Sequence, residues 1–150
     1  MGLTELLKLR CLESDCRTIR VPAGVDLSAE DVDHVVPAGR CKIIGVSLAM
    51  ARDNIPTDAD NSDVSLAESV WFTFIPKLLV TKVADATLRP WVQGEAIFYD
   101  EATWSFTDLT TNLAACGYAL EVVASTATEG LMCFQGDNVG AAAADITASS

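Results

Sequence analysis

Residues 94–136 decide the fold. They read Gly94-Glu-Ala-Ile-Phe-Tyr-Asp100, Trp104-Ser-Phe-Thr107, Cys116-Gly-Tyr-Ala-Leu-Glu-Val-Val123 and Gly130-Leu-Met-Cys-Phe-Gln-Gly136, with polar connections between these segments. Each segment has the length of a strand and is rich in aromatic and branched residues, and turn-forming residues separate one segment from the next. The stretch therefore predicts an all-β, mainly antiparallel fold, either a compact β-barrel or a β-sandwich.

The preceding half of the chain predicts three more strands, at residues 17–21, 41–49 and 70–75. Proline has no backbone N–H to donate to a sheet, so Pro76 predicts a sheet edge or a bulge at the end of the third strand. The acidic, proline-containing and glycine-containing intervals 26–39 and 52–63 predict loops. A faint echo between Ile44-Gly-Val-Ser-Leu-Ala and Cys116-Gly-Tyr-Ala-Leu-Glu suggests two related β-units.

The ends of the chain differ from this β-rich middle. We expect an N-terminal arm at residues 1–16, a core domain at 17–136 and a mobile tail at 137–150. The arm is apolar enough for a short amphipathic helix or for docking on a neighbour. The tail is rich in alanine and serine and lacks large apolar residues. The apolar residues of the arm are Leu3, Leu6, Leu7 and Leu9.

Charge and hydropathy restrict the kinds of partner. The 150 residues include 21 acidic and 10 basic side chains, which gives a net charge of −11. Nucleic-acid binding needs a basic surface, and an anionic membrane repels an acidic one, so we expect neither partner. The mean hydropathy of +0.29 fits a folded domain. No signal peptide or membrane-spanning segment is recognisable, and we expect a soluble protein made in the cytoplasm.

The sequence offers little for catalysis. It contains no phosphate-binding glycine loop and no zinc-protease motif, and His34 is its single histidine. Carboxylates flank Trp104, at Asp100, Glu101 and Asp108, as in some glycosidases. This segment is more typical of a hairpin turn between two strands, with Asp and Glu in the loop and aromatic residues on the strands, which is the better interpretation. We therefore expect no enzyme, and a small hydrolase that uses Asp100 or Glu101 ranks last.

Cysteines and aspartates are the candidate metal ligands. Cys11 and Cys16 have C-x4-C spacing without a second pair, so free thiols are the simplest interpretation. Inter-subunit disulfides or metal binding through these two residues and Cys41 remain open, whereas Cys116 and Cys133 sit in strand-like runs. Loop aspartates could suit Ca²⁺ or Mg²⁺ but lack the EF-hand order, so no metal or cofactor is expected. These aspartates are Asp53, Asp58, Asp60 and Asp63.

The order of the motifs resembles that of a known family. Phe74-Ile-Pro-Lys77 leads to Gln93-Gly-Glu-Ala-Ile-Phe-Tyr-Asp100, then to Trp104-Ser-Phe-Thr107, Gly117-Tyr-Ala-Leu-Glu121 and Glu129-Gly-Leu-Met-Cys-Phe134. This series resembles the small capsid cement, or head decoration, proteins of tailed bacteriophages. The positions that match the family pattern are Pro76, Lys77, Gly94, Tyr99, Asp100, Gly117 and Gly130.

The resemblance implies a structural protein without an active site. Such a protein binds the outer surface of the virion capsid, commonly as a homotrimer, and holds neighbouring major capsid proteins together. Some members carry a recombinase-like label, but the missing phosphate loop argues against an ATPase here. The implied capsid or subunit contacts are Leu3, Leu6, Leu7, Leu9, Trp71, Pro76 and Lys77. The positions expected to define turns are Gly45, Gly94, Asp100, Gly117 and Gly130.

A virion-associated adhesin is the alternative. In that hypothesis an acidic β-rich domain binds carbohydrate or a host surface. Its exposed aromatic platforms would be Trp71, Trp91 or Trp104.

Overall fold

Almost every element of the computed structural model is a strand. The structure describes residues 8–60, 63–82, 90–101, 103–108 and 115–137. The predicted all-β antiparallel class is confirmed, in the form of a nine-stranded curled sheet and a small two-stranded one. The elements are β1 (Lys8–Leu9), a 3₁₀-helix η1 (Glu13–Asp15), β2 (Arg17–Val21), β3 (Val35–Val36), β4 (Cys41–Ile44), β5 (Ser47–Ala51), β6 (Ile55–Pro56), β7 (Ser69–Thr81), β8 (Ala96–Asp100), β9 (Ser105–Thr107), β10 (Ala115–Ala119) and β11 (Glu129–Gln135).

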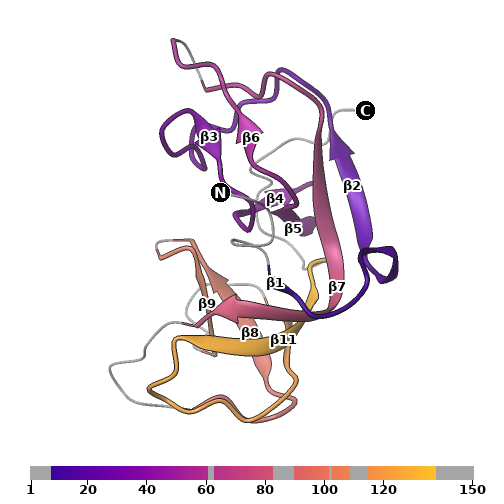
Figure 1. Cartoon of the computed structure of the whole chain (residues 1–150), viewed down its shortest axis with the longest axis vertical. Helices are drawn as coiled ribbons and strands as arrows, with labels where there is room; N and C mark the ends of the chain where they lie inside the picture. Colours follow the sequence, from indigo (N-terminus) through magenta and orange to yellow (C-terminus); the bar gives the residue numbers. More distant parts are fainter. Residues whose placement is uncertain (1–7, 61–62, 83–89, 102, 109–114, 138–150) are drawn as a thin grey trace.

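Strand β7 organises the large sheet. Its 13 residues pair with β2 and β1 along one edge and with β5 and β11 along the other, all antiparallel. Figure 1 shows β7 running beside β2 and then curving to lie beside β11. A strand hydrogen-bonded on both edges satisfies its own backbone and that of four neighbours, so β7 connects the two halves of the molecule.

The predicted irregularity at Pro76 is confirmed as a bulge. Met132 of β11 faces Leu78, whereas Phe134 faces Ile75, so β7 contains one extra residue across this interval. On the opposite edge, β2 pairs up to Phe74 and β1 begins at Leu78. Pro76 therefore lies between two pairing partners, where no ladder bond needs its missing N–H. A bulge also bends its strand, which accounts for the curve of β7.

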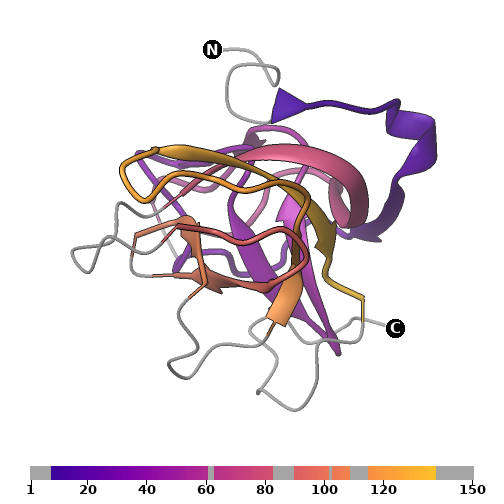
Figure 2. The same ribbon diagram turned by 90° about the horizontal axis from the view of Figure 1, so that it is seen from below.

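The sheet curls into a half-barrel around the main core (Figure 2). Strands β7, β11, β10, β8 and β9 follow one another, and a parallel bridge between Lys82 and Phe106 brings β9 back to the end of β7. Aromatic rings fill the interior, with Phe106 contacting Tyr99 at 5.1 Å and Phe134 at 6.2 Å between ring centroids. Phe72 and Tyr99 are buried there, so these strand aromatics are core residues.

A second core lies on the other face of β7. Successive residues of a strand point to opposite faces, so Phe72 enters the main core and Trp71 enters the second. Both side chains are fully buried. The second core packs Trp71 with apolar residues of β2, β3, β5 and β6 and of the loop before β3, including Leu27 and Val36. Figure 1 places the small β3–β6 sheet at the end of the molecule away from β11.

Three expectations about the first half of the chain are wrong. Residues 41–49 form a hairpin and not a single strand, because Gly45 adopts φ +62° at the first central position of a two-residue turn. Val46 is 61% exposed at its tip and does not face the core. The intervals 26–39 and 52–63 are not wholly loop, because β3 and β6 pair there and bury Val36 and Ile55.

Two of the expected turn glycines lie inside strands. Gly45 and Gly94 are in turns with positive φ, and Asp100 pairs with Ser105 beside the β8–β9 turn. Gly117, however, is within β10, where a Cβ would lie 2.0 Å from the Cys133 carbonyl oxygen. Gly130 is within β11, where a Cβ would lie 2.5 Å from the Trp91 ring. Both are required for close packing.

The expected N-terminal arm is partly integrated into the fold. Residues 8–9 form β1 on the edge of β7, in place of the helix considered for this segment. Leu9, Cys11 and Cys16 pack against the main core, so this part of the expected arm contacts the core domain. Leu3, Leu6 and Leu7 lie outside the described residues, as do residues 138–150 of the tail.

A buried ion pair joins the loop before β3 to the β4–β5 hairpin. The Lys42 ammonium lies 3.6 Å from a Glu30 carboxylate oxygen, and the two side chains are 5% and 4% exposed. Removing one charge of such a pair leaves the other buried without its counter-charge, which is more costly than removing both.

We predict that Lys42→Met lowers the free energy of unfolding by about 3 kcal/mol. Lys77→Met, at an exposed lysine of β7, is the matched control and should change stability by less than about 0.5 kcal/mol. The double variant Glu30→Leu/Lys42→Met should recover most of the loss. Urea unfolding of the wild type and the three variants measures these differences. A Lys42→Met protein as stable as wild type would contradict the burial of the ion pair.

Candidate functional site

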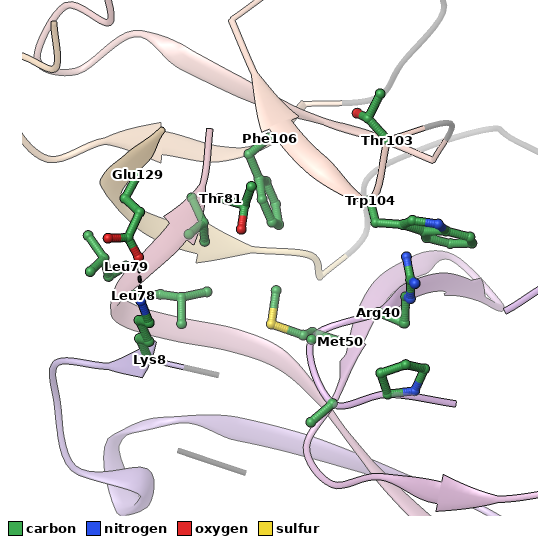
Figure 3. Close-up of a pocket in the computed structure, with 14 residues that line it drawn as sticks. Lys8, Arg40, Met50, Leu78, Leu79, Thr81, Thr103, Trp104, Phe106 and Glu129 are labelled. Carbon is green, nitrogen blue, oxygen red and sulfur yellow. Dashed lines mark hydrogen bonds and ion pairs between the residues drawn. The ribbon is translucent and has the colours of Figure 1, made fainter. Parts of the chain in front are cut away.

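A surface cavity lies where β1, the β4–β5 hairpin and the half-barrel meet. It has a volume of about 440 Å³ and receives residues from both halves of the molecule (Figure 3). Met50 of β5, Leu78 and Val80 of β7 and Phe106 of β9 form an apolar floor. The turn 37–40 forms one wall. The cavity therefore exists only because β7 carries both the hairpin and the half-barrel.

A stacked cation forms one rim of the cavity. The Arg40 guanidinium lies 3.7 Å from the centroid of the Trp104 ring, and the two side chains meet at the cavity mouth (Figure 3). Burial lowers the pKa of Arg40 from its usual range, and nearby Tyr99, Glu30 and Cys41 oppose this shift. Arginine remains a cation at any physiological pH, so this rim presents a positive charge and an aromatic face together.

An ion pair forms the opposite rim. Lys8 of β1 pairs with Glu129 of β11, and both side chains are about two-fifths exposed. Exposed pairs of this kind contribute about 0–1 kcal/mol, so the pair positions β1 more than it stabilises the fold.

The chemistry of the cavity is that of recognition. An apolar floor beside an arginine suits an apolar side chain that has an acidic neighbour. Among the described residues that line it, the ionisable side chains are Lys8, Glu129 and Arg40, and the hydroxyls are those of Thr81 and Thr103. Lys8 and Glu129 are paired with each other, and Arg40 is stacked on Trp104.

The residues expected at capsid or subunit contacts separate into two groups. Trp71 is 0% exposed in the second core, so the expectation that it forms a surface contact is wrong. Lys77 is exposed on the bulge of β7, Pro76 is half-buried beside it, and Leu9 is half-buried against the main core. The Lys77 carbonyl accepts a hydrogen bond from the Arg10 N–H at 3.0 Å, which fixes the β1 segment to the bulge.

The aromatic platforms of the adhesin hypothesis are mostly inside the protein. Trp71 is fully buried, and Trp91 is 1% exposed because it packs against Gly130 on a segment bridged to Val123. Only Trp104 reaches the surface, with its ring covered on one side by Arg40. The structure therefore removes two of the three proposed platforms.

The carboxylates near Trp104 belong to the β8–β9 hairpin, as expected. Asp100 is the last residue of β8 and Glu101 lies in the turn, where it is exposed. Asp108 follows β9 and is 6% exposed. The interpretation of this segment as a hairpin turn is confirmed.

All five cysteines are free thiols. Cys11 and Cys16 approach to 4.0 Å between sulfur atoms beside η1, and burial together with Cys11 raises the pKa of Cys16 to about 12. Burial also raises the pKa values of Cys41 and Cys116 well above their usual range. Thiols that stay protonated are poor nucleophiles and poor metal ligands.

The structure also brings together residues that sequence reasoning left apart. His34 and Asp63 come from different loops and lie side by side with Asp31. Arg40 and Trp104, which are distant in sequence, stack on each other at one rim of the cavity. No local pattern marks such pairs, because each residue belongs to an ordinary turn and only the pairing of distant strands brings the turns together.

Comparison of the chain with protein-family models, with curated proteins and with solved structures finds no match. Within the described residues, no helix is long and apolar enough to cross a membrane.

The three tryptophans predict a simple fluorescence test of the cavity rim. Since Trp71 and Trp91 are buried, Trp104→Phe should remove most of the emission that acrylamide can quench. Trp91→Phe, the control, should lower the intensity and leave the quenchable part in place. If Trp104→Phe left quenching at its wild-type level, the placement of the other two rings inside the cores would be wrong.

The buried thiols predict a loss of stability at alkaline pH. The folded protein keeps Cys41, Cys116 and Tyr99 neutral, whereas the unfolded chain ionises them near their ordinary pKa values of 9.0 and 10.0. Stability is therefore complete below about pH 9 and falls above it, by up to about 1.4 kcal/mol per pH unit for each group. Urea midpoints between pH 7.5 and 10.5 measure this slope, which Cys116→Ala should reduce.

Proposed function

We propose that this chain is a structural capsid cement protein, which binds the outer surface of a viral capsid and stabilises contacts between major capsid proteins. The observation that carries the proposal is the apolar cavity at the junction of β1, the β4–β5 hairpin and the half-barrel. The resemblance to head decoration proteins supports the same function. In this proposal the protein is not an enzyme, and its partners are the major capsid protein and copies of itself, most simply in a homotrimer.

The N-terminal segment supports this function through its mode of attachment. β1 joins the sheet as a short added strand on the edge of β7, next to the cavity. Strand addition is a common way for an extended peptide to bind, because backbone hydrogen bonds supply affinity and side-chain pockets supply specificity. The outer edge of β1 and the cavity together would hold an apolar segment of a neighbouring capsid subunit, with an acidic residue facing Arg40.

Symmetry supplies the remaining affinity. A cavity of about 440 Å³ holds only a few side chains, so a single contact of this kind is weak. Linked copies on a capsid bind with a high effective concentration, and modest contacts then add up to stable attachment. The acidic surface, at a net charge of −11, argues against nucleic acid or an anionic membrane as the partner.

The adhesin alternative has less support. Its binding surface depended on exposed tryptophans, and two of the three are buried. The remaining ring, Trp104, is stacked with Arg40 and lies at the rim of the same cavity. The cement proposal uses both of these residues, whereas a sugar platform would have only the ring face that Arg40 leaves uncovered.

The test is binding to expanded capsids assembled from the major capsid protein encoded in the same genome. We expect the full chain to decorate these capsids at regular positions visible by cryo-electron microscopy. Arg40→Ala should lower the occupancy at least about fivefold, since it removes the charged rim of a binding pocket. Arg20→Ala is the matched control. Arg20 is an exposed arginine of β2 that pairs with Glu68, and this variant should bind like wild type.

Deletion of residues 1–7 provides a second variant for the same assay. It leaves β1 in place, whereas a longer truncation would remove Leu9 and Cys11 from the core. We expect weaker attachment with unchanged thermal unfolding. Absence of wild-type binding would refute the cement function, and normal binding of both Arg40→Ala and the deletion would refute the role of the cavity.

A further inference from the structure

A histidine and two aspartates converge at the end of the molecule that carries the β3–β6 sheet. Asp31, His34 and Asp63 each offer one ligand atom, and these atoms all lie within 4.8 Å of one another. We propose that these three side chains bind a divalent transition-metal ion of the zinc class. This site is separate from the cavity and goes beyond the proposed cement function.

Asp31 is held in place from two sides. One of its carboxylate oxygens accepts the His34 backbone N–H at 2.8 Å, and the other accepts the hydroxyl of Thr57. Thr57 is 5% exposed, and its own N–H donates to the His34 carbonyl at 3.0 Å. Hydrogen bonds of this type orient a ligating carboxylate and reduce the freedom that binding would otherwise remove.

Asp63 reaches the site from a different loop. Its carbonyl accepts the Leu27 N–H at 3.2 Å, and the next residue, Val64, is bridged to Asp26. The segment that carries Asp63 is therefore tied to the loop before β3, which carries Asp31 and His34. The site joins two loops that are distant in sequence, and a bound ion would crosslink them next to the second core.

The spacing of the ligand atoms fits one ion. His34 Nδ1 lies 3.9 Å from Asp63 Oδ1, which is too long for a hydrogen bond. Two ligands on one tetrahedral zinc ion, at about 2.0–2.1 Å for nitrogen and 2.0–2.2 Å for oxygen, lie about 3.4 Å apart. The three ligand atoms, all within 4.8 Å of one another, would therefore close by up to about 1.4 Å around the ion.

The ligand types select the class of metal. An imidazole nitrogen with carboxylate oxygens suits Zn²⁺ and its first-row neighbours better than Ca²⁺ or Mg²⁺, which prefer oxygen ligands throughout. The His34 side chain is 56% exposed and that of Asp63 is 31% exposed, so water has access to the remaining coordination positions. The geometry points to a three-residue site completed by water.

The single histidine of the chain allows a direct test. The full-length protein, treated with a chelator, is titrated with Zn²⁺ while the imidazole signals are followed by NMR. We expect these signals to shift and to saturate at one equivalent. The His34 signal reports on this site and not on the neighbouring thiols of Cys11 and Cys16, whose sulfur atoms lie 4.0 Å apart.

Calorimetry then assigns the ligands in a Cys11→Ser/Cys16→Ser background. Asp63→Asn and His34→Ala should each weaken Zn²⁺ binding by about tenfold or more. Asp60→Asn is the matched control. Asp60 is an exposed aspartate of the same loop as Asp63, and this variant should keep the wild-type affinity for Zn²⁺. Circular dichroism of each variant without metal checks that it is folded.

Two results would overturn the proposal. The first is an imidazole signal that does not change with one equivalent of Zn²⁺ in the unmutated protein. The second is a calorimetric affinity of His34→Ala or Asp63→Asn equal to that of Asp60→Asn. Both readouts concern this site alone, so neither depends on whether the chain binds a capsid.

Discussion

The pairing of β7 along both of its edges is the constraint on which the rest of the structure depends. Four strands hydrogen-bond to it, and its two faces bury Trp71 and Phe72 in separate cores. A straight strand could not serve both halves, because the half-barrel requires the sheet to curl. The bulge beside Pro76 provides that bend where the partner on one edge changes from β2 to β1. Proline is tolerated there because no neighbour needs its N–H.

Both candidate sites follow from this arrangement. The cavity lies where β7 leaves the hairpin and enters the half-barrel, so its floor combines Met50 from one unit with Phe106 from the other. The cluster around His34 lies at the end of the molecule that carries the β3–β6 sheet, where the loops before β3 and after β6 meet. In each case rigid strands hold residues of turns or loops, Arg40 and Trp104 at the cavity and His34 at the cluster, which is a common arrangement for binding residues.

The sequence predicted what is local and missed what is not. Alternating apolar residues and turn signals were enough for the all-β class, the β8–β9 hairpin and the irregularity at Pro76. They were insufficient at Cys41–Ala49. The apolar residues of this segment are typical of one continuous strand, but Gly45 within it has the backbone conformation of a hairpin turn. The stacking of Arg40 on Trp104 and the burial of Lys42 beside Glu30 depend on contacts between distant strands. No pattern within a short window contains that information.

The glycines explain why the family resemblance and the functional surface have to be argued separately. Gly117 and Gly130 match the family pattern, yet both lie inside strands, where a side chain would collide with the Cys133 carbonyl and the Trp91 ring. The suggested echo between residues 44–49 and 116–121 fails for the same reason, since one glycine is in a turn and the other in a strand. Matches at these two glycines reflect how a β-fold packs and do not identify the surface that binds a partner. The binding surface therefore has to be argued from Arg40 and the edge of β1, which lie outside the shared motifs, together with Trp104.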